Sequence, residues 1–297
     1  MLPGPLSGGF MRVAIGVCQL QKDYKRLGVT RIEPTSPSYI RSPMADHQKS
    51  PQGSDDIERL YGVHTVAEAL KNPNRKFIKL LATKNAADRL SPEIAEAGIT
   101  VEPALPRELD RLLGPDAVHQ GLVLDCKPLP QPRLDQIPRE GIVVVLDQVT
   151  DPHNVGAIMR SCAAFGVTAL IATARHSPEA SGVLLKSASG AYEHVPYSKV
   201  TNLARAMEEL RGYGFLLAGL DSEAEEDIGD ARLSRPVALV LGAEGKGLRR
   251  LTRQTCDIVV RLDMPGLIKS LNVSNAAAVA LYALHRSGSS PSEKAQA

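Results

Sequence analysis

Three short segments in the second half of the chain combine glycines with amide, hydroxyl, carboxylate and guanidinium side chains. They run Leu146–Arg160, Leu241–Leu248 and Ser270–Ala276. Each borders an apolar stretch typical of a strand and opens into sequence typical of a helix. A purely structural turn at such a place requires only one capping residue. The surplus of polar residues therefore indicates that the segments form one binding site.

The first segment offers an amide and a guanidinium. Asn154 could simply cap the helix that follows it, and a helix N-terminus also favours an anionic ligand such as an RNA phosphate. Arg160 has small neighbours, including Gly156 and Ala163. Small neighbours allow a guanidinium to lie close to the backbone, as a phosphate or ribose clamp requires, although a solvated surface arginine is the simpler alternative.

The second and third segments favour a ligand that is not a phosphate. Gly242, Gly245 and Gly247 follow an apolar strand, but their spacing matches neither common phosphate-binding loop, and Glu244 would repel a phosphate. A tight turn that brings backbone close to an uncharged or cationic ligand fits better, with simple turn glycines as the alternative. The third segment has four polar residues within six positions, from Ser270 to Asn275, where one cap needs one.

In their order and spacing, these segments resemble the three signature motifs of the SpoU (TrmH-type) family of RNA ribose 2′-O-methyltransferases. The resemblance implies methyl transfer from S-adenosyl-L-methionine to a ribose 2′-hydroxyl, with no metal, on a parallel-sheet (SPOUT) domain whose last segment lies in a deep trefoil knot. It implies catalytic roles for Asn154, Arg160, Glu244, Ser270 and Asn272. It implies cofactor contacts for Gly242, Leu262, Met264, Ser270 and Leu271. Whether Arg160 acts as a base or as an electrostatic stabiliser stays open, because arginine is almost always protonated.

The first half of the chain resembles the family's substrate-binding domain, which is similar in fold to ribosomal proteins that grip RNA. This resemblance begins at Arg59–Leu70. The candidate RNA-binding residues are Arg75, Lys76, Lys79, Lys84 and Arg89, with a solvated charged face as the alternative. The domain pair most resembles bacterial enzymes that methylate a guanosine ribose in large-subunit ribosomal RNA. Family members are homodimers, so Leu271–His285 is an expected part of an interface.

Two other functions remain open. One is a transfer-RNA ribose methyltransferase, although such enzymes often lack the leading domain. The other is a knotted RNA-binding module without catalysis, which the presence of the polar residues argues against. A dehydrogenase is disfavoured, because the glycine fingerprint of a dinucleotide-binding sheet is missing.

The elements that must position the site follow from the periodicity of apolar residues, which predicts an α/β fold. Near-continuous apolar runs indicate a parallel sheet covered on both faces, with strands at Ile142–Leu146, Ala169–Ala172, Phe215–Leu220, Val237–Leu241 and Ile258–Leu262. Helices are expected at Asn154–Phe165, Pro178–Ser189, Thr201–Arg211, Gly247–Thr255 and Leu271–His285.

The smaller leading domain is also expected to alternate strands with helices. After a helix containing Val63 and Leu70, the pattern predicts a strand Lys76–Thr83, a helix Ala86–Ala97, a strand Ile99–Val101, a helix Pro106–Leu113 and a strand Gly121–Cys126. The predicted domain bounds are 56–127 for RNA binding and 141–288 for methyl transfer. A proline-rich linker, 128–140, separates them, and a disordered tail occupies 289–297.

Residues 1–55 are predicted to form a disordered basic leader. Seven of the 35 basic residues, but only three of the 33 acidic ones, lie in residues 1–53, although the net charge of the whole chain is only +2. One interpretation is that the native protein begins at Met44. The other is that the leader is a basic tail that contacts RNA.

The cysteines and the apolar segments favour a cytoplasmic protein. Cys18, Cys126, Cys162 and Cys256 are widely spaced, without a Cys-x-x-Cys pair or a histidine at metal-ligand spacing. They are typical of reduced core residues rather than of disulfides or a zinc site. No secretory signal or membrane span is expected, since the apolar runs are too short.

Overall fold

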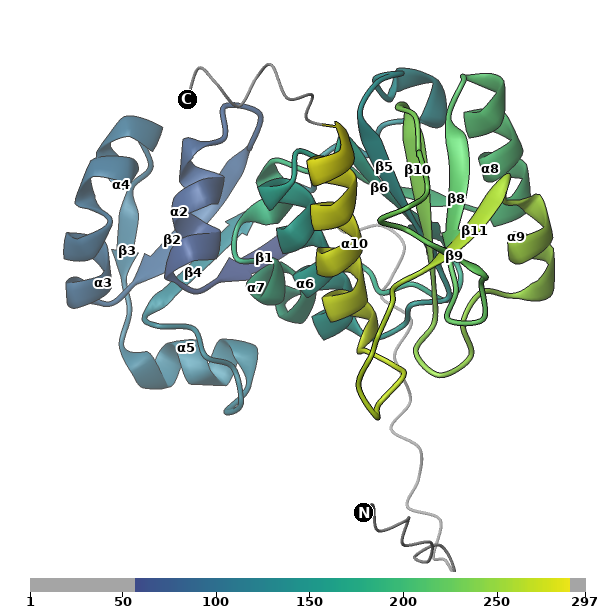
Figure 1. Cartoon of the computed structure of the whole chain (residues 1–297). Coiled ribbons are helices and arrows are strands. Elements are labelled where there is room, and N and C mark those ends of the chain that lie inside the picture. The colour runs from purple at the N-terminus through teal and green to yellow at the C-terminus, as the bar shows by residue number, and fades with distance from the viewer. Residues whose placement is uncertain (1–56, 289–297) are drawn as a thin grey trace, which may run out of the picture. The chain divides into compact units, whose positions relative to one another are not determined.

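The computed structural model describes residues 57–288, so the predicted leader, Cys18 and the predicted tail lie outside the described residues. Within this range helices alternate with strands, and the strands form a four-stranded and a seven-stranded sheet (Figure 1). The predicted α/β class, with a parallel sheet and a smaller leading α/β part, is confirmed.

The smaller sheet has the strand order β1-β4-β2-β3. Its region comprises β1 (Glu58–Tyr61), α2 (Val63–Lys71), β2 (Phe77–Ala82), α3 (Lys84–Arg89), α4 (Ser91–Ala97), β3 (Val101–Pro103), α5 (Pro106–Leu113) and β4 (Leu122–Cys126). The sequence pattern missed β1, because Glu58 and Arg59 interrupt its apolar residues. The predicted helix Ala86–Ala97 is divided at Leu90, since Pro92 belongs in the first turn of a new helix.

The larger sheet is parallel throughout and has the order β7-β6-β5-β10-β8-β11-β9. Its strands are β5 (Ile142–Asp147), β6 (Ala169–Thr173), β7 (Tyr197–Val200), β8 (Leu216–Leu220), β9 (Glu226–Asp227), β10 (Val237–Gly242) and β11 (Ile258–Arg261). The five predicted strands agree within one residue at each end. The two missed strands, β7 and β9, are short edge strands that carry polar residues.

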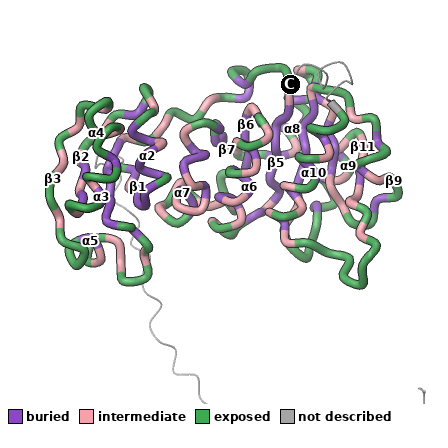
Figure 2. The backbone as a smooth tube through the Cα atoms, turned by 60° about the vertical axis from the view of Figure 1, so that its left-hand side comes forward, coloured by how far each residue is buried: buried purple, intermediate pink, exposed green. Residues whose placement is uncertain are grey.

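Helices cover both faces of this sheet, and β5 is buried along its whole length (Figure 2). Val144 and Leu146 belong to one core cluster and Val143 and Val145 to the other, as the alternation of side chains along a strand requires. The helices are α6 (Pro152–Ala164), α7 (Gly182–Ala188), α8 (Leu203–Gly212), α9 (Arg250–Thr255) and α10 (Val273–Gly288), with short 3₁₀ turns η2 (Leu134–Gln136) and η3 (Ala191–Glu193).

Four predicted helices begin later than expected, and two of them begin more than two residues later. The helix predicted from Pro178 begins at Gly182. The helix predicted from Gly247 begins at Arg250, because Gly247 has a φ of 63°, which is incompatible with a right-handed helix.

The smaller sheet's elements pack closely against α7 and η3. The hydroxyl of Thr65 donates to the carbonyl of Leu185 across 3.3 Å. A Cβ at Gly182 would lie 2.5 Å from the Tyr61 ring, so only glycine permits this approach. The two regions therefore share a packed boundary rather than only a covalent connection.

A buried ion-pair network centred on Arg75 joins the same two regions. Its guanidinium donates to Glu193 across 2.8 Å and to Glu58 across 2.6 Å, and the side chain has no exposed surface. The hydroxyl of Tyr192 also donates to Glu58, across 3.0 Å. Buried charges of this kind require partners on several sides.

The segment between the two sheets packs partly into the core. Leu134 and Ile137 are buried among residues that contact α8, and the hydroxyl of Ser198 on β7 donates to the carbonyl of Pro132. This segment therefore lies against β7 and α8.

The described cysteines are free thiols, with Cys126 and Cys162 buried and Cys256 partly buried. Burial raises the pKa of the Cys126 and Cys256 thiols to about 12. They are therefore protonated and inert at neutral pH. Within residues 57–288, no helix combines the length and apolar content needed to span a bilayer.

Candidate functional site

The carboxyl ends of the central strands bring the three polar segments together. β10 pairs with β5 and with β8, and its register aligns Gly242 with Asp147 and Leu241 with Leu220. In a parallel sheet these ends share one edge, where the connecting loops build a ligand site. A pocket of about 200 Å³ lies at this edge.

The turn after β10 requires glycine because two backbone segments nearly touch. A Cβ at Gly242 would lie 2.2 Å from the carbonyl carbon of Gly247. The Gly247 amide donates to the carbonyl of Ala243 across 2.9 Å, and Gly245 and Gly247 both have positive φ. The glycines thus form a tight backbone curl at the pocket rather than a phosphate loop.

A buried carboxylate holds this curl against the neighbouring strand. Asp147, at the end of β5, is fully buried and accepts hydrogen bonds from the backbone amide and the Nε of Arg249, at 3.0 and 2.6 Å. Asp147 is not among the residues predicted from the sequence. Its signal was an acidic residue that ends an otherwise apolar strand, directly before the first polar segment.

Asn272 connects all three segments. Its Oδ1 accepts from the Ser274 amide across 2.9 Å and so caps α10. Its Nδ2 donates to Asn154 Oδ1 across 3.0 Å and to Glu244 Oε2 across 3.2 Å. One amide group therefore caps a helix and fixes two of the predicted site residues.

The interpretation of Asn154 as a helix cap is wrong. Asp151 caps α6, since its side chain accepts from the His153 amide across 2.9 Å, and Pro152 occupies the first turn. Proline has a fixed φ suited to that position, so the helix begins earlier than expected. Asn154 lies in the first turn of the helix, and its side chain contacts Asn272.

All five predicted cofactor residues line the pocket. The walls combine apolar side chains from Leu241, Leu262, Leu271 and Val273 with the curl at Gly242. The residues Glu244 and Asp221 add carboxylates, and Asp221 is a further residue that the sequence analysis missed. Apolar walls suit an adenine ring, and the carboxylates suit a cation rather than a phosphate. The residues present therefore fit S-adenosylmethionine, which carries a sulfonium.

Arg160 does not line this pocket. It lies six residues after Asn154 on α6, a rise of about 9 Å along the helix. Its side chain is exposed and lines a different hollow, together with His64 and His194. Of the five predicted catalytic residues, Glu244 and Ser270 line the pocket, and Asn272 joins Glu244 to Asn154 by hydrogen bonds. Arg160 does not belong to this group.

Among the predicted RNA-binding residues, Arg75 requires a correction. Its guanidinium is buried in the network with Glu58 and Glu193, so it is not available to a phosphate. Lys79 forms an ion pair of 2.6 Å with Glu102. The remaining three residues, Lys76, Lys84 and Arg89, have exposed side chains.

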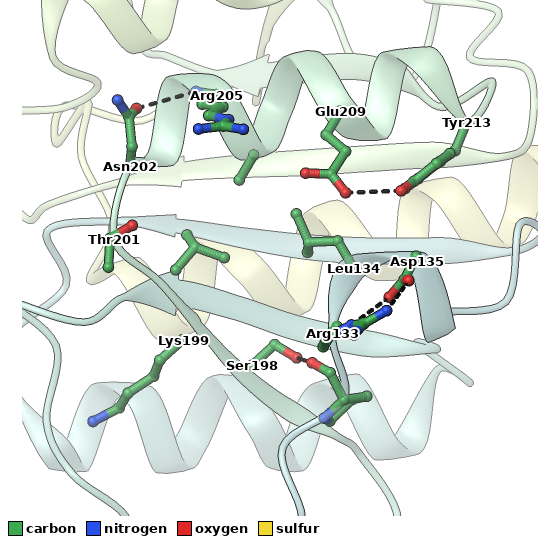
Figure 3. Close-up of a pocket in the computed structure, with 13 residues that line it drawn as sticks. Arg133, Leu134, Asp135, Ser198, Lys199, Thr201, Asn202, Arg205, Glu209 and Tyr213 are labelled. Carbon is green, nitrogen blue, oxygen red and sulfur yellow. Dashed lines mark hydrogen bonds and ion pairs between the residues drawn. The ribbon is translucent and has the colours of Figure 1, made fainter.

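A larger hollow elsewhere lacks the features of a site. It has a volume of about 470 Å³ and lies between η2, β7 and α8 (Figure 3). Its polar groups largely satisfy one another. Arg133 pairs with Asp135, and the hydroxyl of Tyr213 donates to Glu209 across 2.7 Å. Volume alone therefore does not identify the functional site.

No cluster of three or more histidine, cysteine or acidic side chains is placed to hold a metal ion within the described range 57–288.

Two family models match the chain. The SpoU rRNA Methylase family model matches residues 141–282, and a model described as RNA 2′-O ribose methyltransferase substrate binding matches residues 59–132. The two matches thus fall on the larger and the smaller sheet, respectively.

Curated relatives match over most of the chain. A 23S rRNA (guanosine-2′-O-)-methyltransferase RlmB from Yersinia pestis is 38% identical over 239 residues, which cover 77% of this chain and 97% of the relative. The RlmB of Photorhabdus laumondii is 39% identical over 243 residues, which cover 78% and 99%.

A solved structure shares the fold. It is the SpoU methyltransferase AviRb from Streptomyces viridochromogenes in complex with the cofactor AdoMet, which is S-adenosylmethionine. The TM-score is 0.66 at 28% identity, and the match covers 77% of this chain and 89% of AviRb.

Proposed function

The chain belongs to the SpoU rRNA methylase family, and we propose that it methylates the ribose 2′-hydroxyl of a guanosine in 23S ribosomal RNA with S-adenosylmethionine as the methyl donor. The observation that carries this proposal is the meeting of Asn154, Glu244 and Asn272 beside a pocket with apolar walls and carboxylates. The substrate assignment rests on the RlmB relatives, which align along nearly their whole length.

In the proposed reaction, the ribose oxygen attacks the methyl carbon in line as the carbon–sulfur bond breaks, and the hydroxyl proton passes to solvent or to a neighbouring RNA phosphate. When bound, S-adenosylmethionine supplies the activated methyl group. The protein must align the reacting atoms, which can contribute roughly 7–11 kcal/mol to lowering the barrier. The Asn272 amide fixes Asn154 and Glu244 for this purpose. Arg160 stabilises the developing charge on the oxygen, because a guanidinium stays protonated and is a poor base.

We also propose that the active protein is a homodimer. In one copy Arg160 lies outside the cofactor pocket, so a complete site needs either a movement or a second copy. α10 packs on α6 and exposes Val279 and Tyr282, with 47% and 53% of their surface accessible. Two copies that pair through this apolar face would enable Arg160 of one copy to serve the pocket of the other. Light scattering on the purified protein would give the mass of a monomer if this is wrong.

Two further expectations belong to the same proposal. The chain segment from Asp263 to Asn272 is proposed to pass through the loop after β10 as a trefoil knot. The hydrogen bond from Asn272 to Glu244, which lies in that loop, supports this. The protein is proposed to act in the cytoplasm, where ribosomal RNA is found.

Calorimetry and a methylation assay test the proposed activity. The protein should bind S-adenosylmethionine and transfer its methyl group to a 23S rRNA transcript. A transfer-RNA methyltransferase would methylate tRNA transcripts instead, and a non-catalytic RNA-binding module would show no heat of cofactor binding.

A further inference from the structure

A second hollow lies where α2 approaches α6 and the turn around η3, and Arg160 lines it. Its volume is about 350 Å³, which is within the range of sites that bind small ligands, roughly 300–1,000 Å³. Its walls carry His64 and Glu68 from α2, Arg160 from α6, and Ser189, Gly190 and His194 from the turn. Residues from both sheet regions therefore meet in it.

The one carboxylate that lines this hollow already has two protein partners. Glu68 accepts from Lys71 across 3.0 Å at Oε1 and pairs with His194 Nε2 across 2.9 Å at Oε2. The hydrogen bonds from His194 and Lys71 lower the pKa of Glu68 below its ordinary value. With both oxygens occupied, Glu68 offers little repulsion to an anion.

Two donors in the hollow have no protein partner. Within residues 57–288, neither the Arg160 guanidinium nor the His64 imidazole makes a hydrogen bond or ion pair, and both side chains are exposed. A guanidinium presents paired N–H groups that match two oxygens of a phosphate. The hollow therefore presents positive charge and hydrogen-bond donors to solvent, while its acceptor is used internally.

Small residues, including Ala163, Ala188 and Gly190, line the hollow and leave space inside it. A Cβ at Gly190 would lie 2.5 Å from Glu68 Cγ, and Gly190 has a φ of 92°. Glycine at this position thus permits α2 to approach the turn and to bring His64 into the same hollow as Arg160. The site exists only because the two sheet regions are docked together.

We propose that this hollow binds a phosphodiester of the substrate RNA, next to the nucleotide whose ribose is methylated. Arg160 and His64 contact the phosphate oxygens, one from each sheet region, so the contact sets the register of the strand between them. The inference rests on the proposed function, since that function places Arg160 at the target ribose. It adds a named role for His64, a residue to which the resemblance of Arg59–Leu70 assigns no role.

The test places a negative charge at position 64 in one variant and a permanent positive charge there in a second. His64→Glu should weaken binding of a 23S rRNA fragment about tenfold and should lower the slope of log affinity against log salt, because one phosphate contact is lost. Its KM for RNA should rise by the same factor, while the affinity for S-adenosylmethionine and kcat at saturating RNA stay unchanged. His64→Arg should bind RNA at least as well as the wild type. His176→Glu, at an exposed turn, is the matched control for the change in net charge.

The inference is overturned if His64→Glu weakens RNA binding no more than His176→Glu does. It is also overturned if His64→Glu abolishes a heat of binding for inorganic phosphate alone but leaves RNA affinity intact, because the hollow would then serve free phosphate. RNA binding is measured without turnover. A protein that binds the fragment but transfers no methyl group would therefore refute the proposed function, while the comparison of the two variants still decides the role of the hollow.

Discussion

The side-chain amide of Asn272 lies 3.0 Å from Oδ1 of Asn154, which is 118 positions earlier in the chain. The same nitrogen lies 3.2 Å from Glu244. Since Asn272 also caps α10, hydrogen bonds connect the start of the last helix to the two other polar segments. A displacement of any one segment would therefore disturb the geometry of the whole site.

Replacing Arg160 should separate chemistry from cofactor binding. Arg160→Ala is expected to reduce kcat by about 10²-fold or more, because a donor that stabilises developing charge is lost. The affinity for S-adenosylmethionine should not change, since Arg160 does not line the cofactor pocket. Calorimetry and tritiated methyl transfer measure the two quantities, with Arg175→Ala, another exposed arginine, as the control. Near-normal turnover would remove Arg160 from the mechanism.

Adding one methyl group at Gly242 should damage the pocket. In Gly242→Ala the new Cβ would meet the backbone of Gly247 at 2.2 Å, so the curl must open. We expect a loss of cofactor affinity of at least about tenfold, equivalent to about 1.4 kcal/mol. Gly212→Ala is the matched control, because a Cβ there meets no atom within 4 Å. Equal cofactor affinities for the two variants would show that the curl is not essential.

The buried carboxylate of Asp147 should stabilise the same curl. Asp147→Asn removes the charge from two hydrogen bonds to Arg249 and should cost about 1.5–3 kcal/mol in the free energy of unfolding. Arg249→Ala should have a related effect, and the double variant should lose less than the sum of both, since they share one interaction. Thermal unfolding with and without S-adenosylmethionine measures this. Strict additivity would contradict the proposed coupling.

The Arg75 network should govern the stability of the docked arrangement. Arg75→Met leaves Glu193 and Glu58 buried without their cation, which is expected to lower the free energy of unfolding by about 3–5 kcal/mol. Lys79→Met removes an exposed ion pair with Glu102 and should cost at most about 1 kcal/mol. Urea unfolding compares the two variants. Similar losses in the free energy of unfolding would show that the buried ion pairs of Arg75 stabilise the protein no more than the exposed ion pair of Lys79.

The sequence predicted those strands and turns that depend mainly on neighbouring residues. The apolar run Val143–Leu146 indicated a strand covered on both faces, and its side chains do alternate between the two core clusters. The glycines around Gly242 form a tight turn, as the sequence predicted. The short edge strand β7 was missed, because its pairing depends on β6 and not on its own polar sequence.

The errors at the site concern residues whose burial or position is determined by contacts with residues far away in the sequence. Arg75 looks like a surface cation in its own neighbourhood, and only Glu193, 118 positions later, shows that it is buried. The alternative that Asn154 caps the helix was left open because Pro152 was not recognised as part of the first helical turn. The first polar segment alone does not show that Arg160 lies outside the cofactor pocket. Its position depends on which side of α6 faces the pocket.

The most direct measurement is a map of 2′-O-methyl groups on 23S rRNA from cells with and without this protein. One guanosine should lose its ribose methyl group when the protein is absent, and the wild-type chain should restore it where Arg160→Ala does not. An unchanged methylation map, or a lost methyl group that proves to lie on a base rather than on a ribose, would contradict the assignment.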